Sequence, residues 1–316
     1  MLDVRKLRLL RDLADRGTIA AVAAAHNYTP SAVSQQLAAL EREAGAALLA
    51  RTGRGVTLTP AGAVLAAHAE EVFAALERAT AALAATRTGL TGPLRIGAFP
   101  TAMRTLLPTA LATLAREHPG LDLTVDELDP ALVPARLRDG SLDVALVHDY
   151  DLVPIAPDPA LETAPLLDET MYLAATRPLD LAACRDERWI LAGPGTLCHT
   201  MTIRACEAEG FLPRARHHAD DFVTVLTLVA AGQGVAVVPE LALRPPSSPS
   251  AAAAAAPSSP SDPAPVGPSG PGAAPVAPAG VVLTPLRTRR RTRFAYRAGT
   301  GAHPSIAAFT AAVRAA

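Results

Sequence analysis

Hydrophobic positions in the first 44 residues recur at helical spacing and predict three helices. The apolar face of the first comprises Leu7, Leu10 and Ala14. Gly17 ends this helix, and a short helix over residues 19–25 follows. The third helix begins at Thr29 and Pro30, because threonine caps free backbone amides and proline at the first helical position needs no amide partner. Its apolar face comprises Val33, Leu37, Leu40 and Ala44.

The opposite face of the third helix is polar and carries Ser31, Ser34 and Gln35 near its N-terminus. Hydroxyl and carboxamide groups form hydrogen bonds with base edges, and a helix N-terminus attracts a phosphate through its dipole. A short helix, a tight turn and a second helix with such a face form a helix-turn-helix pattern. The alternative is a three-helix domain whose polar face only contacts solvent.

Residues 48–59 predict two short strands around Gly53-Arg54-Gly55, which form a β-wing. Arg51 and Arg54 on this wing are suited to phosphates or to the minor groove. Residues 1–59 carry eight basic and five acidic side chains, although the formal net charge of all 316 residues is −1. We therefore expect double-stranded DNA as the partner, bound by Thr29, Ser31, Ser34, Gln35, Arg51 and Arg54.

Thr59 and Pro60 repeat the capping pattern and predict a long helix over residues 60–88, after the predicted DNA-binding domain of residues 1–59. Its apolar seam has heptad spacing and includes Leu65, Val72, Leu76 and Leu83. A narrow seam on a helix of about 42 Å favours a partner chain, so we expect a homodimer. The alternative is a helix that folds back over its own chain.

From residue 92 to 316 the pattern changes to alternating strands and helices, which predicts an α/β domain with a parallel sheet. Because strand pattern returns near the end of the chain, we expect two subdomains joined by two crossovers. The first comprises residues 92–164 and 281–316, and the second comprises residues 165–240. Residues 245–280 hold eleven prolines and a single charge, so we expect a disordered insertion of unknown role.

Ligands of open α/β sheets bind at the carboxyl ends of strands. The sequence places a candidate set of effector-binding residues there, namely Phe99, Pro100, Thr101, His148, Gly195, Thr196 and Phe222. The two threonines suit a carboxylate or another small anion, although each is equally suited to ordinary helix capping. Asp221 would repel an anion, so the charge of the ligand stays open. We expect His148 to bind ligand or to face solvent, and the arginine run over 287–293 to form the solvated face of a strand.

No catalytic motif is present, since the sequence contains neither G-x-S-x-G nor H-E-x-x-H, a P-loop or a G-x-G-x-x-G after a strand. We therefore predict no enzyme activity, no cofactor and no metal site. The composition, with 50% apolar and 19% charged residues, excludes a chain disordered throughout and a histone-like protein. Neither a signal peptide nor a membrane span is apparent in the sequence, so we expect a cytoplasmic protein.

One motif series connects these predictions to a known family. It comprises Ser31-Ala32-Val33-Ser34-Gln35-Gln36-Leu37, Leu40-Glu41, Gly45, Leu48-Leu49-Ala50-Arg51 and Leu58-Thr59-Pro60-Ala61-Gly62. The series resembles the winged helix-turn-helix of LysR-type transcriptional regulators, and the resemblance continues outside 245–280. It implies a periplasmic-binding-protein-like effector domain, dimers or tetramers, and sequence-specific DNA binding controlled by a small molecule. The apolar second helix, Ala20 to Ala25, departs from the family pattern.

The resemblance also raises a redox alternative, because a peroxide-sensing branch of the family uses two cysteines in the region of Cys198 and Cys206. Eight residues on one predicted helix separate them by about 12 Å, whereas a disulfide requires Cα atoms within about 7 Å. A third alternative is a small-molecule receptor that does not bind DNA.

Overall fold

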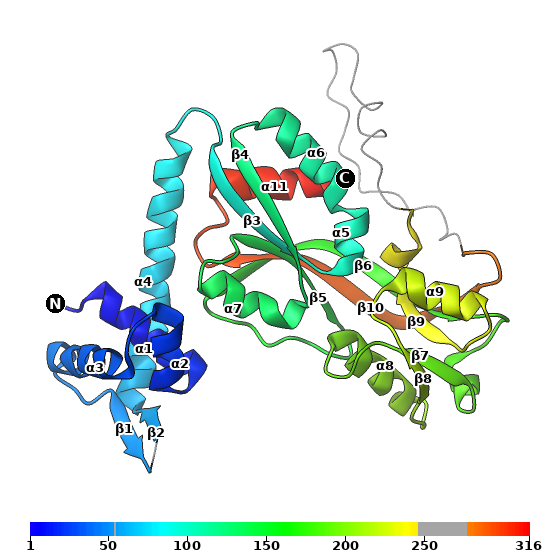
Figure 1. Ribbon diagram of the computed structural model, residues 1–316, viewed down its shortest axis with the longest axis horizontal. Coiled ribbons are helices and arrows are strands. Elements are labelled where there is room, and N and C mark those ends of the chain that lie inside the picture. The colour runs from blue at the N-terminus through cyan, green and yellow to red at the C-terminus, as the bar shows by residue number, and fades with distance from the viewer. Residues whose placement is uncertain (54, 246–276) are drawn as a thin grey trace. The chain divides into compact units, whose positions relative to one another are not determined.

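The computed structural model describes residues 1–53, 55–245 and 277–316 of the chain (Figure 1). Arg54 of the predicted wing and most of the predicted insertion lie outside the described residues. Two compact units are present. The N-terminal unit contains Met1–Thr86 with Asp158–Glu162 and Arg297–His303, and the C-terminal unit contains Arg87–Pro157, Thr163–Tyr296 and Pro304–Ala316.

The N-terminal unit begins with three helices, α1 (Val4–Arg16), α2 (Ile19–His26) and α3 (Pro30–Ala44). Each begins at a side-chain cap, and Thr29 Oγ1 accepts the amide of Ala32 at 3.2 Å to start α3. Gly17 ends α1 with φ 72°, a left-handed conformation that favours glycine. Strands β1 (Leu49–Thr52) and β2 (Gly55–Leu58) follow and pair antiparallel.

Helix α4 (Pro60–Ala85) differs in part from the expected free seam. Its first half packs on α1, where Phe73 is 7% exposed and Arg11 lies 4.9 Å above its ring. Leu65 is partly buried and packs against this core, so part of the predicted seam contacts its own domain. Further along the helix, Val72, Leu76 and Leu83 are 39%, 47% and 70% exposed. The heptad spacing alone did not reveal that the N-terminal part of the α4 seam packs against its own domain.

The C-terminal unit is built on a six-stranded sheet with the order β4-β3-β5-β10-β6-β9. Strand β3 is parallel to both β4 and β5, whereas β10 is antiparallel to β5 and β9 is antiparallel to β6. A second sheet pairs β7 with β8 in parallel. The strands are β3 (Gly92–Ala98), β4 (Leu121–Glu127), β5 (Val144–Tyr150), β6 (Leu161–Ala175), β7 (Arg188–Leu191), β8 (Arg214–His218), β9 (Ala236–Pro239) and β10 (Val282–Arg297).

Helices surround this sheet and form separate apolar cores. One core lies between α6, α11, β3 and β5, and the others lie around β6, β7, β9, α8 and α9. The α-helices are α5 (Pro100–Thr105), α6 (Leu107–Glu117), α7 (Val133–Arg138), α8 (Leu197–Ala208), α9 (Phe222–Ala230) and α11 (Pro304–Arg314). Short 3-10 turns are η1 (Pro130–Leu132), η2 (Leu181–Cys184) and η3 (Glu240–Leu243).

Two elements of this unit have notable bounds. The helical stretch after β3 is divided into α5 and α6, because Pro108 lacks an amide and stands in the first turn of α6. Strand β6 is long and extends from Leu161 to Ala175. Within the described part of the chain, no helix is both long and apolar enough to cross a bilayer.

Candidate DNA-binding surface and effector cleft

The polar face of α3 is separated cleanly from its apolar face. Val33 and Leu37 are buried in the N-terminal core at 0% and 1% exposure, whereas Ser31 and Gln35 are exposed. The hydroxyl of Ser34 donates to the carbonyl of Pro30 at 2.9 Å, so its proton is already used within the helix. The Ser31 hydroxyl lies 2.9 Å from Thr29 Oγ1, where either hydroxyl can donate. Gln35 therefore offers the most available donors on this face, beside the exposed hydroxyl of Ser31.

The wing is attached to α3 by one carboxylate. Glu41 Oε1 accepts the amides of Leu48 and Leu49 at 2.9 and 3.0 Å, which fixes the start of β1 against the end of α3. Arg51 on β1 is exposed and pairs in register with Val56. The structure thus holds α3 and the wing in one unit, each with a polar side chain open to solvent.

In the C-terminal unit a cavity of about 380 Å³ lies where the strands end. Most of the predicted effector-binding residues line it, namely Phe99, Pro100, Thr101, His148, Thr196 and Phe222. Gly195 is not among the lining residues, although its left-handed φ of 91° shapes the turn before α8. Sequence reasoning missed Tyr150, Cys198 and Arg290, which line the same cavity.

His148 lies inside this cavity, so the alternative that it faces solvent is wrong. It is 8% exposed and its ring meets those of Phe99 and Tyr150 edge-on, with centroid separations of 4.7 and 5.3 Å. Burial, aided by the positive charge of Arg290, lowers the pKa of His148 well below its ordinary value. His148 is consequently a neutral imidazole at physiological pH.

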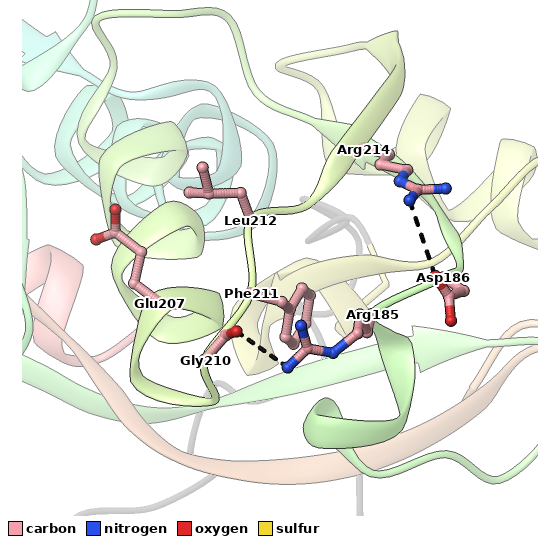
Figure 2. A pocket seen from close by; sticks show the side chains of 7 residues that line it. All are labelled: Arg185, Asp186, Glu207, Gly210, Phe211, Leu212 and Arg214. Carbon is pink, nitrogen blue, oxygen red and sulfur yellow. Dashed lines mark hydrogen bonds and ion pairs between the residues drawn. The ribbon is translucent and has the colours of Figure 1, made fainter.

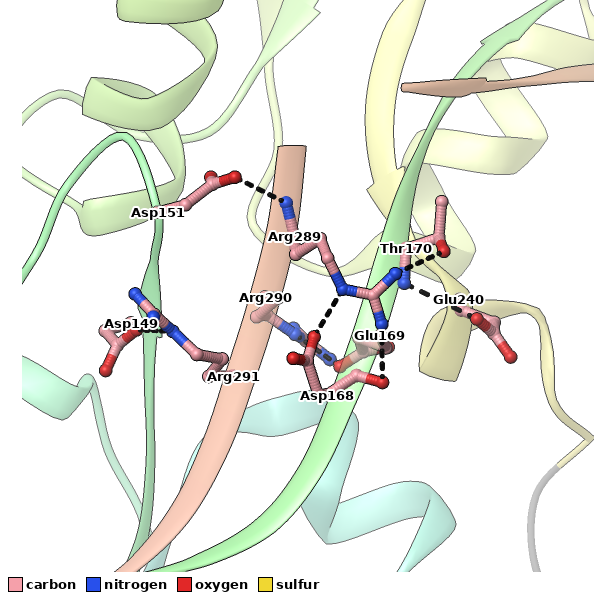
Figure 3. Close-up of polar contacts among 9 residues, drawn as sticks. All are labelled: Asp149, Asp151, Asp168, Glu169, Thr170, Glu240, Arg289, Arg290 and Arg291. Carbon is pink, nitrogen blue, oxygen red and sulfur yellow. Dashed lines mark hydrogen bonds and ion pairs between the residues drawn. The ribbon is translucent and has the colours of Figure 1, made fainter. Parts of the chain in front are cut away.

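Arg290 corrects the expectation that the whole arginine run is solvated. Its side chain is 1% exposed, and its Nε donates to Glu169 Oε1 at 2.7 Å (Figure 3). Glu169 is also buried and accepts the backbone amide of Leu241 through its other oxygen. Alternation along β10 explains the correction, because Thr288, Arg290 and Thr292 share the buried face.

Three other arginines of the run, Arg289, Arg291 and Arg293, lie on the opposite face of β10 and bind acidic neighbours. Arg289 Nε donates to Asp168 Oδ1 at 2.6 Å, and Arg291 Nε donates to Asp149 Oδ1 at 2.8 Å (Figure 3). Arg293 reaches the second oxygen of Asp149 at 3.3 Å. Each of these arginines is paired with an aspartate of a neighbouring strand. Because the aspartates offset their charge, we do not assign DNA binding to this face of β10.

Helices α8 and α9 begin at the cavity with side-chain caps. Thr196 Oγ1 accepts the amide of His199 at 3.2 Å and donates to the carbonyl of Gly193 at 2.9 Å, so this threonine is a helix cap. Asp221 caps α9 by accepting the amide of Thr224 at 3.0 Å. The Thr196 hydroxyl is thus occupied within the chain. The other amides in the first turn of α8 have no partner within the helix and can donate to a ligand.

The cysteines are thiols rather than thiolates. Burial raises the pKa of Cys198 and of Cys184 to about 11, and that of Cys206 to about 12. Cys198 and Cys206 stand near opposite ends of the continuous helix α8. Among the described residues, no group of three or more histidine, cysteine or acidic side chains is placed to hold a metal ion.

A second hollow of about 500 Å³ lies near the C-terminal end of α8 and was not predicted (Figure 2). Arg185 crosses it, donating to the carbonyl of Gly210 at 3.0 Å and lying 5.8 Å above the ring of Phe211. Arg214 lies 3.9 Å from Asp186 at its edge. Arg185 contacts a carbonyl and a ring, and Arg214 contacts an acid, so the hollow is a surface groove whose arginines already have partners within the chain.

Two family models match the chain. Residues 4–63 match "Bacterial regulatory helix-turn-helix protein, lysR family", and residues 87–264 match "LysR substrate binding domain". A probable hydrogen peroxide-inducible genes activator of Mycobacterium avium is 32% identical over 246 residues, which cover 75% of this chain and 78% of the relative. The transcriptional dual regulator GltC of Bacillus subtilis is 27% identical over 249 residues, covering 76% and 81%.

Solved structures show the same fold. A full-length OxyR variant from Pseudomonas aeruginosa matches with a TM-score of 0.57 at 21% identity, covering 99% of this chain and 95% of the other. Full-length BenM matches with a TM-score of 0.52 at 19% identity, covering 99% and 96%. Members of the family are regulators that bind DNA and small-molecule effectors, form oligomers and are not enzymes. With the exposed α3 face and the cleft, these matches show that the chain belongs to the LysR family, as a DNA-binding transcriptional regulator that responds to an effector.

Proposed function

We propose that this regulator reads a DNA operator with the exposed N-terminal turn of α3 and changes its DNA binding when a small molecule occupies the cleft. The carrying observation is the exposure of Ser31 and Gln35 on a helix whose other face is fully buried. Thr29 and Ser34 shape this turn through their own hydrogen bonds. Arg51 and Arg54 of the wing are assigned to phosphates or the minor groove. A protein that acts on DNA in this way would work in the cytoplasm.

The test of DNA reading is a gel-shift titration with the intergenic DNA upstream of a neighbouring divergent gene. Replacing Gln35 by Ala, together with Ser31→Ala, should weaken specific binding about tenfold or more, since a base contact contributes roughly 1–3 kcal/mol. Gln36→Ala, one position around the helix, is the matched control and should weaken binding less. Equal loss in both variants, or no loss in the double variant, would contradict the assignment.

The wing is tested by salt. Arg51→Ala should weaken binding to all sequences alike and reduce the slope of log affinity against log salt by about one. A change confined to one sequence would instead indicate base reading by Arg51. If the protein bound no DNA at low salt, the receptor alternative without DNA binding would replace the regulator proposal.

Oligomerisation is assigned to the exposed part of the α4 seam, which comprises Val72, Leu76 and Leu83. Their exposure leaves apolar surface that a second copy of the helix would cover. Leu76→Glu with Leu83→Glu should convert dimers or tetramers to monomers in size-exclusion chromatography with light scattering. Val64→Glu is the control, because Val64 is 60% exposed on the same helix but off the seam.

Effector control by ligand binding is favoured over a disulfide switch. Several relatives carry the printed name of hydrogen peroxide-inducible activators, but the raised pKa values of Cys198 and Cys206 oppose thiolate chemistry. Cys206→Ser, which changes the cysteine that does not line the cavity, should therefore leave the effector response intact. Loss of that response, with peroxide altering DNA binding of the unmodified protein alone, would favour the redox alternative.

A further inference from the structure

The cavity in the C-terminal unit contains buried polar atoms that the described chain does not satisfy. Arg290 Nη2, His148 Nδ1 and the Tyr150 hydroxyl each lie away from solvent without a hydrogen bond of standard geometry. The thiol of Cys198 is near enough to Tyr150 to influence its pKa, but it is a weak partner. Buried polar groups in folded proteins nearly always have hydrogen-bond partners. Three such groups on residues that line one cavity indicate a site built for a polar ligand.

Arg290 is the charged member of this group. Glu169 occupies its Nε, and both oxygens of Glu169 are engaged, one by Arg290 and the other by the Leu241 amide. The guanidinium carbon lies 5.1 Å above the ring centre of Phe99, so one planar face is covered by an aromatic ring. A ligand therefore meets Arg290 at its edge, where the N–H groups are, in the geometry that suits a planar carboxylate.

The start of α8 adds a second source of positive potential. Leu197 and Cys198 line the cavity in the first turn of this twelve-residue helix, where backbone amides have no partner within the helix. The Thr196 cap satisfies only the His199 amide of that turn. Arg290 and the helix start thus favour a negative group at the same cavity.

Acidic side chains at the cavity limit the charge of the ligand. Glu127, Asp129 and Asp220 all line it. Asp129 accepts the amide of Ala131, and Asp220 accepts the amide of Gly193, each at 2.8 Å. Their charges would repel a dianion, whereas a single carboxylate needs only the Arg290 edge. The volume of about 380 Å³ is at the small end for ligand sites.

We propose that the effector of this regulator is a small monocarboxylate, whose carboxylate binds the edge of Arg290 with the Tyr150 hydroxyl as a further donor. The inference deepens the proposed function and rests on it, because it names the chemical class that the cleft takes. Phe99 and Tyr150 add no positive charge to the cavity, so neither side chain balances a second negative charge on a ligand. Inorganic phosphate is therefore the competing ligand that the experiment compares with carboxylates.

The experiment measures binding to the full-length protein by calorimetry and by the thermal unfolding midpoint. The probes are propionate and benzoate, their neutral amides propionamide and benzamide, and inorganic phosphate. We expect at least one carboxylate to bind and its amide to bind about tenfold more weakly or worse, because the amide loses the charge-assisted bonds. Inorganic phosphate should bind more weakly than that carboxylate.

Variants assign the binding to Arg290. Arg290→Lys keeps the positive charge but loses the planar fork, and should reduce carboxylate affinity about tenfold or more. Arg289→Lys is the matched control, since Arg289 is the next residue of β10, is exposed and is held by Asp168. Tyr150→Phe keeps the aromatic packing and removes only the hydroxyl, so a few-fold loss in this variant supports the site even if Arg290→Lys does not fold.

Several outcomes would overturn the inference. These are equal binding of acid and amide, tighter binding of phosphate, no binding by any probe, or carboxylate binding that neither Arg290→Lys nor Tyr150→Phe weakens. DNA binding measured on the same preparations separates this failure from that of the proposed function. Intact gel shifts with no carboxylate preference would remove the ligand class alone, whereas absent gel shifts would remove the regulator proposal.

Discussion

Polar residues have opposite environments on the exposed face of α3 and in the cavity of the C-terminal unit. On α3, Ser31 and Gln35 are exposed to solvent on the face opposite the buried Val33 and Leu37, so a partner can replace the water around them without disturbing the core. In the cleft, Arg290 and His148 are already removed from water and have atoms without partners. The polar groups on α3 therefore contribute to binding and little to stability. Each buried polar group in the cavity affects both ligand binding and stability.

The largest expected effect comes from Glu169→Ala, because Glu169 binds the cavity residue Arg290. Removing this carboxylate leaves Arg290 buried without its counter-charge, which should cost roughly 3–5 kcal/mol of unfolding free energy. Urea unfolding followed by tryptophan fluorescence reports on the C-terminal unit, because Trp189 of that unit is the only tryptophan of the chain and is 0% exposed.

The matched control for Glu169→Ala is the double variant Glu169→Leu with Arg290→Met. Because it removes both charges together, the double variant should recover much of the stability lost in Glu169→Ala. If both proved equally unstable, packing rather than charge would account for the loss.

In the N-terminal unit the sensitive position is a glycine instead of a polar group. A Cβ at Gly62 would lie 2.1 Å from the carbonyl oxygen of Leu48, where the backbone cannot easily yield. Gly62→Ala should cost about 1–3 kcal/mol by overpacking, measured as faster amide hydrogen exchange in α1 and α3. Ala63→Ser, at the next and exposed position, should leave exchange unchanged.

His148 should make the C-terminal unit sensitive to acid. Its pKa in the folded protein is lowered because burial disfavours the imidazolium, whereas the unfolded chain has a pKa near 6.5. Below about pH 6.5 the unfolded state takes the proton first, so stability is present at neutral pH and falls with acidification, by up to about 1.4 kcal/mol per pH unit.

This pH dependence is measured by urea unfolding at pH 7 and pH 5.5, with Trp189 fluorescence as the signal. His148→Gln should remove the added slope. His68→Gln is the control and should retain it, because the His68 side chain is 66% exposed. An unchanged slope in His148→Gln would show that His148 is protonated in the folded state.

The smallest effect on stability is expected where the effect on DNA binding is largest. Ser31→Ala with Gln35→Ala removes exposed groups with no tertiary role, so thermal unfolding should shift within about 0.5 kcal/mol. A loss comparable to that of Gly62→Ala would mean that the α3 face is packed in solution, and it would remove the contrast between the two regions.

Local sequence patterns predicted several helix starts and strand ends, because capping and periodicity depend only on residues that are neighbours in the sequence. Thr29 and Pro30 start α3 where capping chemistry requires it, and the strand ends place Phe99 and Thr101 at the cavity. Heptad spacing also identified the exposed Val72, Leu76 and Leu83 of α4. It could not show that Leu65 packs on its own domain, because α1 meets α4 only after folding.

The sequence by itself determined the helix-turn-helix, the α/β character and most residues at the strand ends, since capping, periodicity and strand order are written in neighbouring residues. Only the tertiary structure decided which arginine of β10 became buried. Arginines occupy both faces of that strand, so alternation alone does not distinguish Arg290 from Arg289 and Arg291. The choice depended on Glu169, 121 positions away, and on which face of the sheet the cores cover.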